Sequence, residues 1–233
     1  MPQFTKTGLG FVVEPQVRPF CGPLFFTNSL ETPLGSITAA GSFGLVDTGT
    51  RRLLVTCHHV WDEFQTQHVQ NSDLKMCVCL DRGNPIVFDT ETLIDADKRL
   101  DLATFDMARL LSAYGPERFY PLKQKPAPVV KKGNVLFLIG FPGHLRQVVD
   151  GALGVGRTPY CVRTSSVDGL RFQSDVTNLK IKAEDYGGIS GCPTFLVRDE
   201  DKPVQLVGFT TGTWMNLLFF THARCLKIGR AHV

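Results

Sequence analysis

The sequence predicts an all-β protein made of short antiparallel strands joined by tight turns. Apolar residues recur in short alternating runs, and turn-forming residues separate these runs, with 22 Gly and 14 Pro among 233 residues. No helical pattern of the length that a βαβ crossover needs lies between the runs, which excludes a parallel α/β sheet. With a hydrophobic share of 43%, the chain can bury a core as one large domain or as two small ones.

The first half of the chain is expected to hold an extended arm and then a group of strands. Five prolines interrupt the apolar patches of residues 1–35, which indicates an arm lying on the body of the protein. A strand at 52–56 would deliver His59 just after its end, at the start of a short helical turn through 60–64. The strands expected in this half are 41–47, 52–56, 75–80, 86–92 and 102–107.

A shift in composition marks the boundary expected between the two halves. Residues 115–133 contain four prolines and end in Lys131-Lys132-Gly133. Short alternating runs follow, at a spacing that favours a sandwich or a barrel. The strands expected beyond the boundary are 134–140, 147–155, 160–164, 169–174, 194–197, 204–211 and 217–221.

Charge and composition exclude several classes of partner. The 25 basic and 22 acidic residues leave a net charge of +3 without a dense Lys/Arg run, so we expect neither nucleic acid nor membrane as a partner. The N-terminus lacks the apolar segment of a secretory signal, and the apolar run 135–141 is too short to span a bilayer. Seven irregularly spaced cysteines fit free thiols in a reducing compartment, which favours a cytoplasmic protein.

The cysteines are expected to be small buried side chains rather than metal ligands. Cys77 and Cys79 belong to a predicted strand, and we interpret them as small hydrophobic side chains of the core. No second Cys/His pair lies at a spacing suited to zinc. We therefore expect no metal and no organic cofactor.

The stretch Gly187–Pro193 is the strongest functional signal in the chain. Its glycines allow a tight turn with φ values that other residues rarely adopt, and such a turn leaves the hydroxyl of Ser190 exposed. The N–H groups of Gly188 and Ser190 would then point into one small concavity, where an oxyanion sits if Ser190 attacks a carbonyl. An ordinary Gly-rich β-turn is the alternative interpretation.

Two further motifs precede this turn in a fixed order. The run 53–61 is an apolar strand that ends in a histidine, and Asp101 opens a second apolar segment. His59 and Asp101 lie 42 residues apart, and Asp101 and Ser190 lie 89 residues apart. The motifs read Thr-x-x-His-Val, Asp-Leu-Ala and Gly-x-Ser-Gly-x-Pro. Over about residues 41–221, this pattern resembles the trypsin-like (chymotrypsin-fold) serine peptidases, especially their bacterial members.

The resemblance implies two antiparallel six-stranded β-barrels with the active site between them. The N-terminal barrel, 36–120, would carry the histidine and the aspartate of a catalytic triad. The C-terminal barrel, 121–227, would carry the serine and the oxyanion hole. The order His, Asp, Ser along the chain is the order of this fold.

By resemblance, the protein is expected to be a serine endopeptidase that acts on proteins or peptides. Ser190 would attack the scissile carbonyl and form an acyl-enzyme, while the N–H groups of Gly188 and Ser190 hold the oxyanion. His59 would transfer the proton, and Asp101 would orient the imidazole. His58 is the alternative base. The alternative acids are Asp95, Asp97 and Asp106.

The resemblance also implies residues that set specificity. Glu184 lies six residues before Ser190, where enzymes specific for basic residues carry an acid at the base of the S1 pocket. Glu184, or else Asp185, would therefore favour Lys or Arg at P1, and a surface acid is the alternative interpretation. Thr210 and Thr211 would belong to an edge strand that pairs with the substrate backbone.

Two residues of the serine turn depart from the family pattern. Ile189 stands where enzymes activated by propeptide cleavage carry an aspartate for the new N-terminal ammonium, so that activation is not expected. Cys192 replaces the second glycine after the serine. These departures leave open a second hypothesis, a catalytically silent barrel that binds peptide or protein strands.

The last six residues are treated separately. Ile228–Val233 reads like the translation of a common sequencing adapter, and we exclude it from the fold as an artefact. A natural chain would then continue beyond this point and would have room for a fused regulatory domain.

Overall fold

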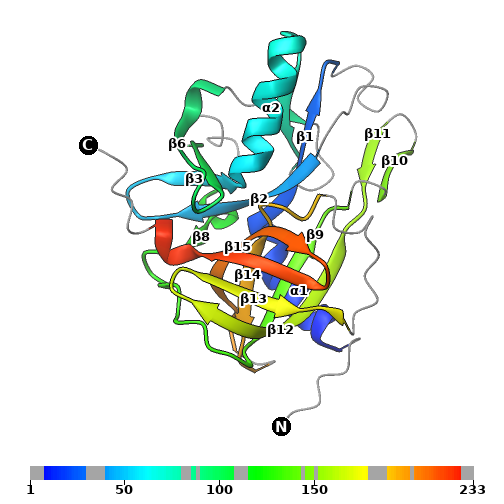
Figure 1. The fold of residues 1–233 in the computed structure, drawn as a ribbon. Coiled ribbons are helices and arrows are strands. Elements are labelled where there is room, and N and C mark those ends of the chain that lie inside the picture. The colour runs from blue at the N-terminus through cyan, green and yellow to red at the C-terminus, as the bar shows by residue number, and fades with distance from the viewer. Residues whose placement is uncertain are drawn as a thin grey trace.

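The computed structural model describes residues 8–29, 40–79, 85–87, 90–107, 115–142, 145–149, 152–177, 188–199 and 202–226. The fold is mainly β, with an open sheet from the first half of the chain and a closed six-stranded barrel from the second half (Figure 1). The β class and one six-stranded antiparallel barrel are thus confirmed. In the described ranges, the first half forms an open sheet rather than a second closed barrel.

The open sheet has the strand order β5-β4-β1-β2-β3-β7-β6, and β8 pairs with β2. Its strands are β1 (Cys21–Thr27), β2 (Ala40–Asp47), β3 (Arg52–Thr56), β4 (Lys75–Val78), β5 (Ile86–Val87), β6 (Leu93–Asp97), β7 (Leu102–Asp106) and β8 (Tyr120–Pro121). β3 and β7 are antiparallel, with Thr56 opposite Ala103. This register sets the end of β3 beside the turn that precedes β7.

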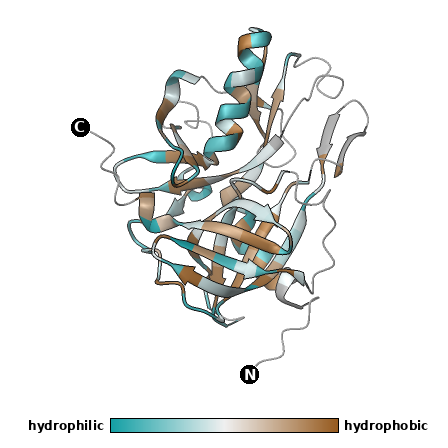
Figure 2. Cartoon of the chain, in the orientation of Figure 1, coloured by the Kyte–Doolittle hydropathy of each residue, from teal (hydrophilic) through white to brown (hydrophobic). Residues whose placement is uncertain are grey.

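The barrel closes in the order β12-β13-β16-β15-β14-β9. Its strands are β9 (Val135–Gly140), β12 (Thr158–Asp168), β13 (Arg171–Asp175), β14 (Pro193–Val197), β15 (Gln205–Trp214) and β16 (Leu217–His222). A separate hairpin consists of β10 (Arg146–Val149) and β11 (Ala152–Val155). Figure 2 shows hydrophobic stretches along the barrel strands, as closure around an apolar interior requires.

β9 is buried along its whole length because its two faces meet different cores. Leu136 and Leu138 pack in the barrel interior. Phe137 and Ile139 pack in a second core, which also includes Val55 of the sheet. This second core joins the two halves of the molecule, so a site at their junction is held from both sides.

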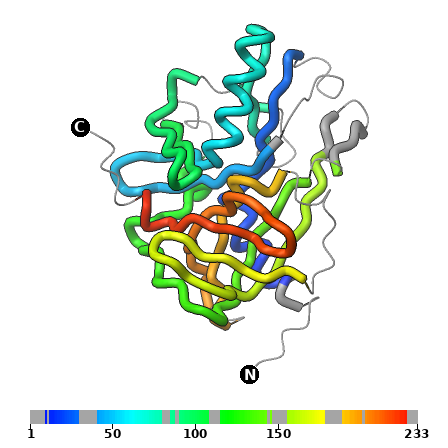
Figure 3. Tube along the Cα trace, viewed as in Figure 1, coloured from blue at the N-terminus to red at the C-terminus, as the bar shows by residue number. Residues whose placement is uncertain are grey.

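The N-terminal segment, expected to be an extended arm, contains a helix and a central strand in its described part. The helix α1 (Gly8–Val17) packs Val13 and Val17 into the core that joins the two halves. All seven residues of β1 are buried, and β1 lies between β2 and β4. Figure 3 shows the chain passing from α1 beside the barrel into the sheet.

The helix α2 (His58–Gln70) is longer than the turn predicted over 60–64. It packs on the sheet through Val60, Trp61 and Phe64. The ring of Trp61 meets Phe105 of β7 edge-on, with ring centroids 5.5 Å apart. Short 3₁₀ helices lie at Arg18–Phe20, Thr90–Thr92, Pro116–Arg118 and Ala223–Leu226. In the part of the chain that the structure describes, no helix combines the length and the apolar character needed to cross a membrane.

Candidate active site

The centre of the candidate site is a pair formed by His59 and Asp101. β3 ends at Thr56, Cys57 precedes α2 in an extended conformation, and His59 lies in the first turn of α2. The antiparallel pairing of β3 with β7 brings Asp101, in the turn before β7, to the same end of the sheet. The strand pattern places His59 at the end of β3, and the register of β3 with β7 places Asp101 beside it. Two residues that are 42 positions apart in the chain therefore meet.

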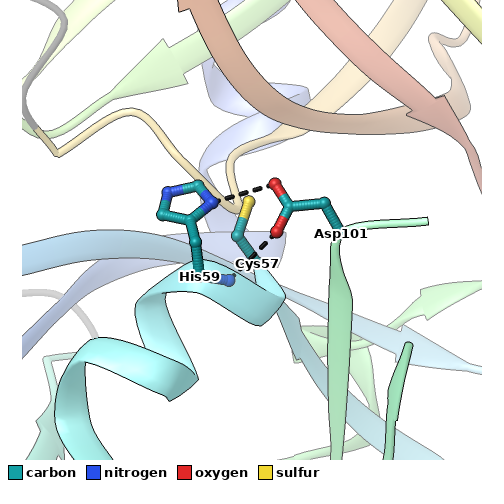
Figure 4. Close-up of side chains that lie close together, drawn as sticks. All are labelled: Cys57, His59 and Asp101. Carbon is teal, nitrogen blue, oxygen red and sulfur yellow. Dashed lines mark hydrogen bonds and ion pairs between the residues drawn. The ribbon is translucent and has the colours of Figure 1, made fainter. Parts of the chain in front are cut away.

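Both carboxylate oxygens of Asp101 are engaged by His59. The backbone N–H of His59 donates to Asp101 Oδ1 at 3.0 Å, and the ring Nδ1 lies 2.9 Å from Asp101 Oδ2 (Figure 4). The ring is half-exposed, whereas Asp101 is more enclosed. Because Asp101 accepts from Nδ1, the neutral imidazole carries its proton there and Nε2 is left as the basic nitrogen.

Asp101 has a positive φ of 53°, which is uncommon for any residue other than glycine. Asp and Asn tolerate this left-handed conformation better than most residues. The conformational strain of this left-handed backbone lies at the residue whose carboxylate contacts His59. Strain of this kind is typical of functional sites.

Two glycines of the turn around Ser190 adopt the left-handed backbone that the sequence predicts for this turn. Gly188 and Gly191 have positive φ values of 97° and 90°. The N–H of Cys192 donates to the carbonyl of Ile189 at 3.0 Å and closes the turn. Ser190 itself is partly buried. Gly187 lies outside the described residues.

The serine turn is fastened to the sheet through Ser42 on β2. The Ser42 hydroxyl donates to the carbonyl of Gly188 at 2.6 Å, and the Ser42 N–H donates to the carbonyl of Ser190 at 2.7 Å. Thr56, three residues before His59, donates its hydroxyl to the carbonyl of Ser42 at 2.8 Å. The strand that ends near His59 and the turn that carries Ser190 are thus joined through one buried serine.

Gly191 is needed for this close approach. A Cβ built on Gly191 would collide with the carbonyl oxygen of Ser42 and would lie 2.6 Å from Thr56 Oγ1. Any larger residue would therefore push the serine turn away from the end of β3. Within the described residues, the Ser190 hydroxyl has no hydrogen-bond partner, and hydrogen bonds of this kind often tighten only when a substrate is bound.

The barrel holds the other side of the serine turn through the two residues that depart from the family pattern. Ile189 is buried in the barrel core, directly over Gly140 of β9. Cys192 is also buried and donates its thiol to the carbonyl of Ile139. Burial raises the pKa of the Cys192 thiol well above its usual range, so this side chain is a neutral core group.

Thr210 supports the serine turn rather than standing free. Its carbonyl accepts the N–H of Gly191 at 2.8 Å, and its N–H donates to the carbonyl of Cys192 at 2.8 Å. The ladder between β15 and β14 ends at Phe209, so this flank of β15 has no ladder partner at Thr211 among the described residues. Strand pairing by a ligand at Thr210 and Thr211 therefore stays a prediction, and on this flank the backbone groups of Thr210 are already bonded within the protein.

The remaining candidates fall into two groups. Among the described alternatives to Asp101, Asp97 accepts the N–H of Leu100 in its own turn at 2.9 Å, and Asp95 is exposed on β6. Asp106 lies at the far end of β7, opposite Leu53. Glu184 and Asp185, the candidates for P1 specificity, lie outside the described residues.

One group at the site escaped sequence reasoning. Cys57 is fully buried, and its thiol donates to the carbonyl of Thr210 at 3.1 Å. Burial raises the pKa of this thiol well above its usual range, and the nearby carboxylate of Asp101 raises it further. One ligand atom each from Cys57, His59 and Asp101 lies within 4.8 Å of the other two, so these residues are also a candidate metal-binding cluster.

The chemistry of the site is inferred from these residues alone. No protein-family model matches the sequence, and no curated protein matches it. The geometry offers an imidazole oriented by a carboxylate, and a glycine turn that carries the Ser190 hydroxyl and is joined to the sheet at Ser42.

Proposed function

We propose that the protein is a serine endopeptidase with the two-barrel chymotrypsin-type fold and an active site between its halves. The observation that carries this proposal is the pair of hydrogen bonds from His59 to Asp101. It is supported by the hydrogen bond that joins the serine turn to Ser42, whose own carbonyl accepts the hydroxyl of Thr56 at the end of β3. An ordinary exposed ion pair does not depend on hydrogen bonds between segments so far apart in the chain.

In the proposed mechanism, Ser190 Oγ attacks the scissile carbonyl while His59 Nε2 takes its proton. Asp101 stabilises the imidazolium that forms and keeps the ring oriented. The N–H groups of Gly188 and Ser190 stabilise the oxyanion of the tetrahedral intermediate. His59 then gives the proton to the leaving amine, and a water molecule hydrolyses the acyl-enzyme by the reverse path.

The two-barrel assignment is part of this proposal. It is supported by the origin of the residues, because His59 and Asp101 come from the sheet of the first half and Ser190 from the barrel of the second. Ile189 adds a feature of its own. It packs in the barrel core over Gly140, so the serine turn is held by apolar packing and needs no ion pair with a new N-terminus.

A second candidate function is a peptide-binding protein without catalysis. One observation favours it, namely that the Ser190 hydroxyl makes no hydrogen bond to His59 in the described part of the chain. In that case the flank of β15 at Thr211 would pair with an extended peptide that is not cleaved.

The deciding experiment is covalent labelling by a fluorophosphonate probe, which reacts with activated serines. The parent protein is compared with Ser190→Ala and His59→Ala, and His58→Ala serves as the matched control because it removes the neighbouring histidine. We expect labelling of the parent and of His58→Ala and loss of labelling in the other two variants. Near-ultraviolet circular dichroism establishes that each protein is folded.

Two outcomes would contradict the peptidase. Labelling that persists in Ser190→Ala would show that another residue reacts. A folded parent that binds peptides but is never labelled would instead support the second candidate. If labelling succeeds, a peptide library compares the parent with Glu184→Gln, and we expect the variant to lose preference for Lys or Arg at P1.

A further inference from the structure

The thiol of Cys57 lies within 4.8 Å of both a ring nitrogen of His59 and a carboxylate oxygen of Asp101, and a peptidase mechanism has no use for it there. Figure 4 shows the sulfur between the imidazole and the carboxylate. Cys57 is fully buried, and α2 begins at the next residue, so its position is set by the packing of that helix. Cys57 belongs to the same core cluster as Val60 and Trp61 of α2, which fixes its place next to the pair.

Three different donor atoms converge at this point. Cys57 Sγ, a ring nitrogen of His59 and a carboxylate oxygen of Asp101 all lie within 4.8 Å of one another. The ring Nδ1 and Asp101 Oδ2 are already 2.9 Å apart. Zinc bonds of about 2.3 Å to sulfur and about 2.0–2.2 Å to nitrogen and oxygen separate neighbouring ligands by about 3.3–3.6 Å in a tetrahedron. Small side-chain shifts therefore bring all three atoms to bonding distance of one ion.

We propose that Cys57, His59 and Asp101 form a binding site for Zn²⁺. The donor set selects this class of ion, because thiolate and imidazole suit zinc, whereas Mg²⁺ and Ca²⁺ require oxygen ligands. The S–H bond of Cys57 breaks as the sulfur–zinc bond forms, and its proton leaves to solvent. The half-exposed ring of His59 marks the open side, where water takes the fourth position.

One outer contact of the three residues suits a metal site. Asp101 Oδ1 accepts the backbone N–H of His59, which holds the carboxylate in place while Oδ2 faces the ion. Contacts of this kind orient metal ligands and raise affinity. The hydrogen bond from the Cys57 thiol to the carbonyl of Thr210, 3.1 Å long, is given up when the thiol loses its proton to bind the ion.

The consequence for activity rests on the proposed peptidase function. An ion bound at Nδ1 replaces the hydrogen bond to Asp101, and the proton of the neutral ring then sits on Nε2. Nε2 therefore has no lone pair with which to take the proton of Ser190, and the charge of the ion opposes a second protonation of the ring. Zinc would therefore switch off activation of Ser190 without touching Ser190 itself.

The site is tested first by binding, independently of catalysis. The purified protein is titrated with Co²⁺, whose thiolate complexes give a charge-transfer band in the near ultraviolet and intense visible bands when tetrahedral. We compare the parent with Cys57→Ser and with Cys161→Ser, which removes a partly buried thiol of β12. We expect the bands in the parent and in Cys161→Ser, their loss in Cys57→Ser, and displacement of Co²⁺ by Zn²⁺.

Two results would overturn the site: a parent without the charge-transfer band, or a Cys57→Ser variant that keeps it. If Cys57→Ser does not fold, Asp101→Asn replaces it, and we expect weaker Co²⁺ binding by about tenfold or more. In a second readout, we expect Zn²⁺ to slow fluorophosphonate labelling of the parent about tenfold and that of Cys57→Ser less than about twofold. A parent that binds Co²⁺ but is never labelled refutes the peptidase and leaves the metal site standing.

Discussion

Asp101 accepts two hydrogen bonds from His59, one from its backbone N–H at 3.0 Å and one from its ring Nδ1 at 2.9 Å. The backbone bond ties Asp101 to the first turn of α2, and the ring bond orients the imidazole. Asp101 makes both contacts from a left-handed backbone, with a φ of 53°, in the turn before β7.

The first prediction concerns this carboxylate. Asp101→Asn preserves the shape of the side chain and tolerates the positive φ, but an amide no longer stabilises the imidazolium and can favour the wrong tautomer. We expect the rate of fluorophosphonate labelling to fall by about 10³-fold to 10⁴-fold. Asp95→Asn, an exposed acid of β6, is the control and should leave the rate unchanged. Equal labelling of Asp101→Asn and the parent would remove Asp101 from the mechanism.

The second prediction concerns the serine that joins the two halves. Ser42→Ala deletes the hydroxyl that donates to the Gly188 carbonyl, and the loss of a buried hydrogen bond costs about 1–3 kcal/mol of unfolding free energy. We expect slower labelling of Ser190 together with this destabilisation, measured by urea unfolding. The matched control is Ser174→Ala, because Ser174 is equally buried but its hydroxyl has no partner among the described residues. Similar losses in both variants would contradict a specific role for Ser42.

The third prediction concerns the approach of the serine turn to the sheet. Gly191 and Gly133 both have positive φ, near 90°, but only at Gly191 would a Cβ meet Ser42 and Thr56. We expect Gly133→Ala to cost about 1 kcal/mol of unfolding free energy, the cost of backbone strain alone. Gly191→Ala should cost at least about 3 kcal/mol and abolish labelling, because the turn must move. Near-equal costs in the two variants would mean that the turn yields to the extra methyl group.

The fourth prediction concerns pH and the buried His222. Burial and then the nearby Arg224 lower the pKa of its imidazole from 6.5 to about 4, and the Pro128 carbonyl acts in the opposite direction. Nδ1 accepts the N–H of Arg224 at 3.1 Å, which favours the neutral ring. Between about pH 6.5 and about pH 4, the unfolded chain binds a proton that the folded protein excludes, so unfolding free energy falls as the pH is lowered.

The shift corresponds to a loss of about 3 kcal/mol at most over this range. His222→Asn keeps an acceptor for Arg224 without an imidazole and should flatten the dependence, as measured by urea unfolding at several pH values. His68→Gln, which removes an exposed histidine of α2, should retain the slope of the parent. An unchanged slope in His222→Asn would assign the pH dependence to other groups.

Much of the strand pattern could be predicted because it is local. β3 coincides with the predicted strand at 52–56, and β7 lies within one residue of 102–107. Alternation of apolar residues and turn-forming residues between them are properties of neighbouring positions. α1 could not be predicted in this way, because Gly8, Gly10 and Pro15 disfavour a helix and tertiary contacts compensate, among them the burial of Val13 and Val17.

The sequence by itself determined the β class, most strand positions, and the three motifs that name His59, Asp101 and Ser190 as the residues to examine. Tertiary structure alone decided that Asp101 rather than its neighbouring acids contacts His59, that Ser42 holds the serine turn, and that the Cys57 thiol lies within 4.8 Å of both. The physical reason is the distance along the chain between the residues that interact. Turns and periodicity are set by interactions between adjacent residues, whereas these contacts depend on strand registers and packing between segments far apart in the chain.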